Sequence, residues 1–162
     1  MRWDEFAEAC PELAIRTQER FSQDEVVMLG TVRKDGWPRV SPVEPDFAAG
    51  HLFLGMMWRS RKAHDLRRDS RCVVHSVPTN RMNPGGDIKL YGRAIEVQEP
   101  ELRRAYRAAI AARIDWAPDE PQYHLYSIDV DTAAHVRFDE GVFETLRWTP
   151  AGGLVKEARP SA

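Results

Sequence analysis

The sequence predicts a mainly β fold, a small antiparallel β-barrel with helices at its periphery. Six or seven strand-like patterns follow one another with turns at short intervals, and three further segments have helical patterns. The chain of 162 residues has the size of one domain and shows no internal repeat. We therefore expect a single domain over residues 1–150 and a flexible tail over residues 151–162.

The N-terminal part of the chain predicts helix and then a β-hairpin. Pro11 fits the first position of a helix whose apolar residues fall on one side. Residues 25–33 predict a strand that is apolar on both faces, which suits a barrel wall covered by a helix or a second subunit. Asp35 and Gly36 predict a tight turn. Residues 37–47 predict a strand with three prolines, which should lie at an edge or be broken by bulges because proline lacks an N–H donor.

The most informative stretch joins a strand over residues 51–58 to a short helix that Ser60 can cap. Arg61 and Lys62 fall in the first helical turn, where the helix dipole is already positive and four N–H groups lack partners. A cation there costs about 0.3–1 kcal/mol, so the pair makes sense if an anion such as phosphate binds the helix end. A solvent-exposed basic turn explains the same residues, and this stretch alone leaves both interpretations open.

The second half of the chain predicts mostly β structure. Residues 71–77 predict a short strand, and residues 78–86 predict a loop rich in proline and glycine. Residues 87–98 predict a long strand with a bulge or a close backbone approach at Gly92. Pro100 begins a second amphipathic helix. Three further strand patterns follow, over residues 123–130, 135–138 and 142–148.

Composition narrows the functional classes. A formal net charge of −2 argues against nucleic acid or a membrane surface as the main partner. Cys10 and Cys72 are isolated, so the sequence predicts neither a disulfide framework nor a zinc site. The five histidines show no metal-binding spacing, and His75, at the end of an apolar strand, is the one considered as a proton donor. No leader or membrane-spanning run is evident, so we expect a cytoplasmic protein.

Three segments resemble the pyridoxamine 5'-phosphate oxidase-like, FMN-binding split-barrel family in their order and spacing. They are residues 31–43 (TVRKDGWPRVSPV), residues 60–69 with Ser60-Arg61-Lys62-Ala63, and residues 89–94 (KLYGRA). The resemblance extends over roughly residues 10–148. It implies a six- to seven-stranded antiparallel split β-barrel with Greek-key character, FMN as the cofactor, and a homodimer in which two subunits share each cofactor site.

The resemblance also implies which residues bind the cofactor. The basic pair and the serine before it hold the flavin phosphate, a strand lies along the ring and ribityl chain, and the end of another strand frames the ring. In this chain these positions are Ser60, Arg61 and Lys62; Arg39, Val40, Ser41 and Pro42; and Met56, Met57 and Trp58. The partner subunit contributes Asp87, Lys89 and Trp148.

Several of these residues have a structural alternative. Trp58 and Trp148 are equally well explained as barrel core, and Arg39 could simply pair with a carboxylate across the sheet. Asp87 takes a position where true oxidases of the family have glutamine, and a carboxylate is unfavourable beside a reduced, anionic flavin. The sequence nominates no catalytic acid, base or nucleophile, as is usual where the cofactor performs the chemistry.

The resemblance implies a flavin-dependent oxidoreductase that transfers a hydride or electrons to an unknown small molecule. Residues 146–162 lack the Arg- and His-rich segment with which true oxidases grip pyridoxamine phosphate, so we do not expect that activity. One alternative is a reductase that uses the deazaflavin coenzyme, whose carboxylate tail Arg59, Arg67, Arg68 and Arg81 could bind; these arginines could equally balance surface acids. The other is a non-catalytic protein that binds or stores flavin or haem.

Overall fold

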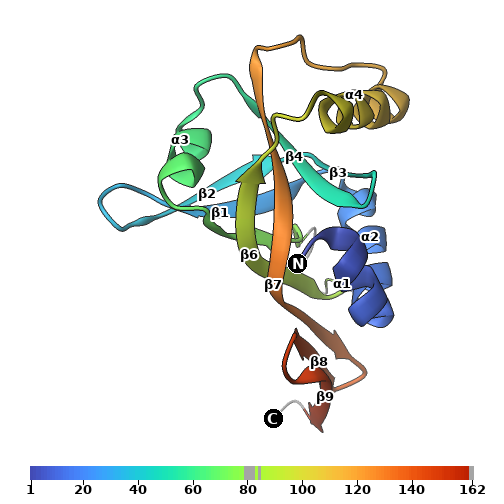
Figure 1. Cartoon of the computed structure of the whole chain (residues 1–162). Coiled ribbons are helices and arrows are strands. Elements are labelled where there is room, and N and C mark those ends of the chain that lie inside the picture. The colour runs from blue at the N-terminus through green and yellow to red at the C-terminus, as the bar shows by residue number, and fades with distance from the viewer. Residues whose placement is uncertain (79–82, 84, 161–162) are drawn as a thin grey trace.

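The computed structural model describes residues 1–78, 83 and 85–160, which form four helices and nine strands (Figure 1). The helices are α1 (Trp3–Ala9), α2 (Pro11–Asp24), α3 (Arg61–Arg68) and α4 (Pro100–Ile114). The strands are β1 (Val27–Val32), β2 (Pro38–Val43), β3 (Pro45–Ala48), β4 (His51–Met57), β5 (Arg71–His75), β6 (Asp87–Glu96), β7 (Tyr123–Asp139), β8 (Val142–Thr149) and β9 (Gly153–Pro160). Within the described residues, none of the helices is long and apolar enough to cross a membrane.

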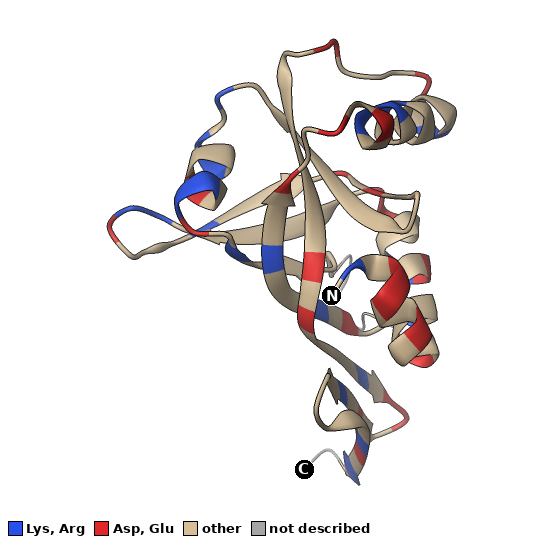
Figure 2. Cartoon of the chain, in the orientation of Figure 1, with Lys and Arg blue, Asp and Glu red and all other residues tan. Residues whose placement is uncertain are grey.

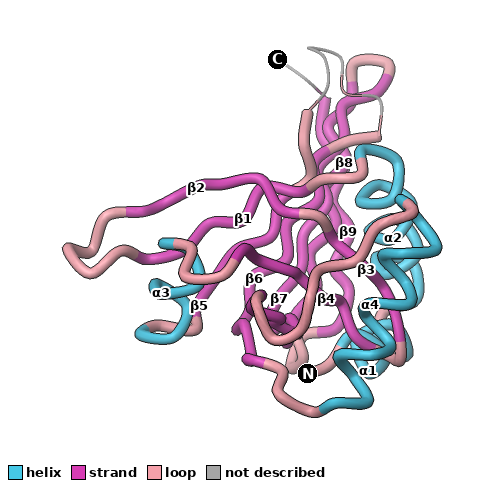
Figure 3. Tube along the Cα trace, turned by 90° about the horizontal axis from the view of Figure 1, so that it is seen from above, coloured by secondary structure: helices cyan, strands magenta, loops and turns pink. Residues whose placement is uncertain are grey.

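The main sheet has the strand order β2-β1-β5-β6-β7-β4-β3, and all neighbouring strands are antiparallel. β2 and β3 are its two edges, yet Glu44 alone separates them in the chain. The sheet therefore curves until its edges approach each other, as the view from above shows (Figure 3). No ladder joins these edges in the described part of the chain, so the barrel is open.

The prolines of residues 37–47 produce this opening. Pro38 and Pro42 lie on β2, Pro45 begins β3, and both strands have a partner on one side only. The sequence analysis placed this segment at an edge or expected bulges to break it; the structure confirms the edge position and interrupts the segment at Glu44, with no bulge in the β1–β2 ladder. A proline cannot donate to a ladder, so an edge position leaves no hydrogen bond unmade.

The core lies mainly between the curved sheet and the two N-terminal helices. α2 buries the apolar side that its sequence predicts, including Leu13 and Phe21, and α1 adds Trp3 and Phe6. A second cluster forms where α4 covers β4 and the start of β7. Its buried members are Phe53, Val97, Tyr106, Ile110, Tyr123 and Leu125. α3 lies apart from these helices, beside β1 and β2 (Figure 1).

Two sequence expectations need correction. Residues 123–130 and 135–138 are not separate strands, because β7 continues through them and pairs with β4, β6 and β8 in turn. The expected flexible tail instead contains β9, which pairs with β8 along its whole length. Gly152 and Gly153 form the hairpin turn: the Gly152 N–H donates to Thr149 Oγ1 at 2.9 Å, and Gly153 has a φ of +64°. These glycines form a turn between two strands, whereas the sequence analysis expected a flexible tail.

Gly92 marks the one irregularity in the β6–β7 ladder. The register shifts between Tyr91 and Gly92, which confirms the predicted bulge. A Cβ atom at Gly92 would lie 1.9 Å from the carbonyl oxygen of Asp129, so the two backbones meet where only glycine fits. This close approach holds the two central strands of the sheet together.

We therefore expect Gly92→Ala to destabilise the protein by about 3 kcal/mol, since a backbone carbonyl cannot move aside as a flexible side chain would. Urea unfolding measures the change. Arg93→Ala, which removes an exposed side chain from the same strand, is the matched control and should change the free energy of unfolding by about 0.5 kcal/mol or less. Equal stability of Gly92→Ala and wild type would show that the ladder can relax.

Candidate functional site

A tight turn between β4 and α3 positions the predicted anion site. Arg59 has a φ of +58°, and its N–H donates to Nε2 of His124 at 3.1 Å. The Ser60 N–H donates to the Met57 carbonyl at 3.1 Å, and Ser60 has the extended backbone of an N-cap residue. The Ser60 side chain makes no capping hydrogen bond. The first turn of α3 therefore keeps its N–H donors available, as the sequence predicts for an anion site.

Two buried hydroxyl groups near this turn have no hydrogen-bond partner among the described residues. They are the Oγ atoms of Ser41 on β2 and of Ser60 at the start of α3. A buried polar group without a partner costs about 1–3 kcal/mol, so native proteins rarely keep two of them in one region without a reason. A ligand that accepts hydrogen bonds would satisfy both hydroxyls.

Lys62 links β2 to α3 across the same region. Its Nζ atom donates to the carbonyl oxygen of Pro42 at 2.8 Å. Burial lowers the pKa of Lys62, because the ammonium group loses water and gains a neutral carbonyl in its place. A bound anion would oppose this shift, because it favours the charged form. This hydrogen bond joins β2 at Pro42, the residue after Ser41, to α3 at Lys62, two residues after Ser60.

Arg39 pairs with a carboxylate, as the structural alternative anticipated, but the carboxylate belongs to α3 and does not lie across the sheet. Its Nε atom donates to Asp65 Oδ2 at 2.6 Å, and Thr31 Oγ1 donates to the same oxygen at 3.0 Å. Asp65 is only 4% exposed. Burial alone would raise the pKa of this carboxyl group, but the hydrogen bonds from Arg39 and Thr31 outweigh burial and hold the pKa below its usual value. Arg39 therefore anchors α3 to β2 as well as lining the site.

Arg61 lines a basic cleft of about 520 Å³ between α3 and the β1–β2 hairpin. Four cations and two carboxylates line this cleft together with one histidine. These residues are Arg33, Lys34, Asp35, Arg39, Arg61, His64 and Asp65. Basic residues gather on α3 and on the hairpin, whereas acidic residues are prominent on α1 and α2 (Figure 2). The excess of positive charge favours an anionic ligand.

A more apolar cleft of about 310 Å³ lies at the end of β4. Met57 and Trp58 line it with Trp116 from the loop after α4, and these side chains are 80%, 47% and 56% exposed. Met56 also lines the cleft but is itself almost completely buried. Exposed apolar side chains in such a group suit a planar ligand or a second subunit.

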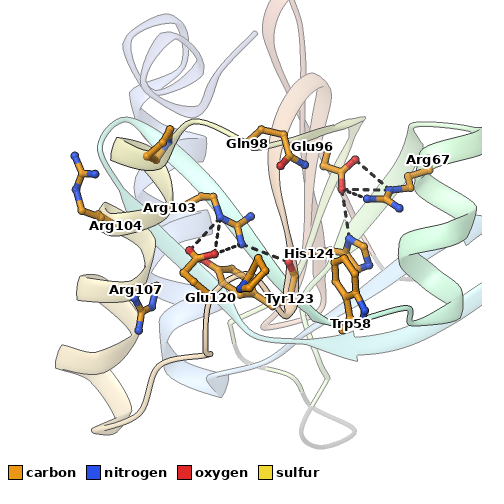
Figure 4. A pocket seen from close by; sticks show the side chains of 12 residues that line it. Trp58, Arg67, Glu96, Gln98, Arg103, Arg104, Arg107, Glu120, Tyr123 and His124 are labelled. Atoms are coloured by element: carbon orange, nitrogen blue, oxygen red, sulfur yellow. Dashed lines mark hydrogen bonds and ion pairs between the residues drawn. The ribbon is translucent and has the colours of Figure 1, made fainter.

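His124 connects Trp58 to the turn before α3. Its ring stacks on Trp58 with centroids 4.8 Å apart and an interplanar angle of 12° (Figure 4). Because Nε2 accepts the Arg59 N–H, the proton of the neutral ring lies on Nδ1, which faces Glu96 Oε1 at 3.3 Å. Burial lowers the pKa of His124, although Glu96 opposes this shift. The neutral ring is thus the form that holds the turn.

The remaining predicted residues lie elsewhere. Trp148 is 2% exposed and packs against Phe6, so it belongs to the core and presents no ring face to a ligand of a second subunit. Val40 is exposed on the opposite face of β2 from Arg39, because side chains alternate along a strand. Asp87 and Lys89 lie on β6, beside β5 and β7, and line neither of the two clefts described above.

The cations considered for a deazaflavin tail are largely paired. Arg67 forms a bidentate pair with Glu96, at 2.6 Å for the shorter contact, and Arg68 lies 3.4 Å from Asp65. Arg81 lies outside the described residues. His75 lies on β5 with Nδ1 against the Ser76 carbonyl oxygen, so its proton-donor role stays a prediction.

The sequence analysis missed Asp65, His124 and Trp116. Asp65 is buried on α3 together with Ala63 and Leu66, but it lies two and one residues from them, which is not the spacing of residues on one helical face, so the sequence pattern did not indicate its burial. The buried carboxylate depends on hydrogen bonds from Thr31 and Arg39, which only the fold supplies. His124 and Trp116 likewise carry no signal in the sequence, because only the fold brings them to Trp58.

Solved structures of low sequence identity share this fold. A Clostridium acetobutylicum protein related to general stress protein 26 of B. subtilis, of the pyridoxinephosphate oxidase family, gives a TM-score of 0.65 at 14% identity, over 85% of this chain and 94% of that chain. A pyridoxamine 5'-phosphate oxidase-related, FMN-binding protein from Nostoc punctiforme gives a TM-score of 0.64 at 15% identity, over 91% of this chain and 95% of that chain. A haem-binding protein from Mycobacterium smegmatis gives a TM-score of 0.56 at 14% identity, over 90% of this chain and 87% of that chain.

These likenesses establish the fold class, an open antiparallel barrel with peripheral helices. No curated protein matches the sequence. A sequence model described as pyridoxamine 5'-phosphate oxidase matches residues 13–137, well over half of the chain. The chain therefore belongs to the pyridoxamine 5'-phosphate oxidase family, which confirms the resemblance found in the sequence.

The buried His124 predicts a pH dependence of stability. Its folded-state pKa is lowered, so the unfolded chain takes up a proton first as the pH falls below about 6.5. The free energy of unfolding should therefore decrease as the pH falls through this range. Urea unfolding between pH 7.5 and 5.5 should show a smaller decrease in His124→Gln than in wild type.

Burial also lowers the pKa of His135. This residue should therefore contribute separately to the decrease in the free energy of unfolding at low pH. His135→Gln is thus the comparison variant, and the double variant should have the flattest profile. An unchanged profile in His124→Gln would refute the neutral, buried state of His124.

Proposed function

We propose that the protein binds FMN with the flavin phosphate at the start of α3 and acts as a flavin-dependent oxidoreductase on a small molecule. The observation that carries this proposal is the pair of buried, unpartnered hydroxyls of Ser41 and Ser60, in a region that also holds Lys62. Family membership supplies the expectation of a flavin. The N. punctiforme relative of the same fold is an FMN-binding protein, which supports the choice of cofactor.

The residues present fit a phosphate ester. Arg61 and Lys62 supply positive charge, and the Ser41 and Ser60 hydroxyls and the first N–H groups of α3 supply donors. When bound, FMN supplies the hydride or electron transfer. The chain holds the phosphate, orients the cofactor along β2, and offers an apolar wall at Met57 and Trp116 that keeps water away.

The pairing of Arg67 and Arg68, two of the four arginines considered for the tail of the deazaflavin coenzyme, supports FMN over that coenzyme. A tail of carboxylates needs free cations, whereas Glu96 holds Arg67 in a bidentate pair and Asp65 lies beside Arg68. A flavin- or haem-storage role remains the second candidate, favoured by the fold shared with the M. smegmatis haem-binding protein. The visible spectrum of the purified protein separates flavin from haem.

We also propose that the protein is a homodimer. Large apolar side chains are exposed on two strands of the sheet: Val40 on β2, and Tyr91 and Ile95 on β6, are 63%, 48% and 46% exposed. A second subunit would cover such a surface. Asp87 and Lys89 are the residues proposed to reach the cofactor of the partner.

Light scattering at micromolar protein concentration should give twice the mass of one chain, 18.5 kDa. The exposed apolar strands are the physical reason, because their burial stabilises the dimer. Val40→Asp should shift the equilibrium toward monomer, whereas Glu157→Asp on the exposed face of β9 is a neutral control. A wild-type protein that stays monomeric would exclude a cofactor site shared between subunits.

The double variant Arg61→Ala/Lys62→Ala should fold and bind FMN at least 100-fold more weakly. Two charge-assisted contacts of about 1.5–3 kcal/mol each are lost. Stability should change little or rise, because two cations leave the positive end of a helix. Titration calorimetry with FMN and, at the same salt concentration, the deazaflavin coenzyme measures both affinities. Arg93→Ala/Arg147→Ala removes the same charge from exposed strand positions and should bind FMN like wild type.

Ser41→Ala/Ser60→Ala tests the hydroxyls separately. Without cofactor this variant should be as stable as wild type or more stable, because it removes two buried groups that lack partners. Its FMN affinity should fall. Lower stability without cofactor, together with unchanged FMN affinity, would place the phosphate site elsewhere.

A further inference from the structure

A third cleft, of about 440 Å³, lies between α3 and α4 and is separate from the basic cleft at the start of α3 (Figure 4). Its floor comes from the first residues of β7, including Tyr123 and His124, and its walls come from the two helices. The volume is that of a small-molecule site. Because four arginines line it, we call it the arginine cleft: Arg67, Arg103, Arg104 and Arg107.

Two hydrogen-bonded groups line the arginine cleft and fix its shape. In the first, Arg103 donates to both oxygens of Glu120 and lies 4.1 Å above the ring of Tyr123, whose hydroxyl also donates to Glu120 at 2.8 Å. In the second, Glu96 accepts from Arg67 and faces His124. These contacts hold the lining side chains in place before any ligand arrives.

The charge of the arginine cleft is unbalanced. Four arginines face two carboxylates: Arg67 pairs with Glu96 and Arg103 with Glu120, which also attracts Arg107. Two positive charges therefore remain in excess. Arg104 has only a long, exposed contact of 3.9 Å with Glu101. The Nε atom of Arg107 is buried and has no hydrogen-bond partner in the described part of the chain. A buried guanidinium donor without an acceptor points to a missing anion.

The opposite side of the cleft offers an aromatic surface. One face of the Trp58 ring is stacked on His124, yet 47% of the residue remains exposed. A planar ring can stack on that exposed surface while a charged group attached to it reaches toward α4. Gln98 adds an amide that can donate to or accept from such a ligand.

We propose that the arginine cleft is a binding site for a small planar aromatic anion, with a carboxylate or phosphate group held by Arg107 and the ring packed against Trp58. Both charged groups share the acceptor oxygens that an arginine recognises. The site uses none of Ser41, Ser60 and Lys62, the residues proposed to hold the flavin phosphate, although Trp58 lines both this cleft and the apolar cleft beside Met57.

The test uses the full chain carrying Arg61→Ala/Lys62→Ala, so that no probe binds at the start of α3. Titration calorimetry with benzoate and phenyl phosphate should show binding at least tenfold tighter than with acetate, which lacks the ring, or benzyl alcohol, which lacks the charge. Arg107→Gln should weaken binding of the aromatic anions at least tenfold. Arg93→Gln, an exposed arginine on β6, is the matched control and should leave their affinity unchanged.

Trp58→Leu gives a second measurement should Arg107→Gln fail to fold. This substitution should weaken the binding of benzoate at least threefold and leave the affinity for acetate unchanged. A preference for benzoate or for phenyl phosphate identifies the charged group and supports the site in either case. The proposal is overturned if neither aromatic anion binds more tightly than benzyl alcohol, or if Arg107→Gln and Trp58→Leu both bind like the parent.

Discussion

The buried carboxylate of Asp65 is the interaction on which the position of α3 depends. It lies on the inner side of a helix of only eight residues and receives hydrogen bonds from Thr31 on β1 and Arg39 on β2. A helix this short is unstable alone, so its orientation comes from tertiary contacts. Breaking a buried ion pair by removing one partner costs about 3–5 kcal/mol, which is a large fraction of the stability of a domain.

This anchoring explains how the start of α3 can keep polar groups without hydrogen-bond partners. The middle of the helix is held by Asp65, and the turn before it is held by His124 and Met57. With both neighbours fixed, the Ser60 hydroxyl and the first N–H groups cannot rearrange to find partners of their own. A site that stays organised without its ligand loses less conformational entropy on binding.

The sequence predicted what depends on local chemistry. The proline-rich edge strands, the Asp35-Gly36 turn, the bulge at Gly92 and the basic first turn of α3 follow from backbone geometry and spacing, and the structure contains each of them. It could not predict what depends on pairing between distant segments. Trp148, for which the sequence left core and cofactor site equally open, enters the core because β8 passes α1, and β9 forms because β8 offers it a partner. The contact of His124 with Trp58 likewise requires β4 and β7 to be neighbours.

The stacked pair of Trp58 and His124 couples regions that the sequence treats separately. Trp58 lines both the apolar cleft beside Met57 and the arginine cleft, while His124 holds the turn that leads into α3. A ligand that moves the Trp58 ring therefore acts on His124, and through Arg59 on the orientation of the first turn of the helix. Because Nε2 of His124 can accept the Arg59 N–H only when it carries no proton, the same contact makes that orientation depend on the protonation state of one ring. Trp58, His124 and Arg59 thus form a short chain of contacts between the arginine cleft and the start of α3.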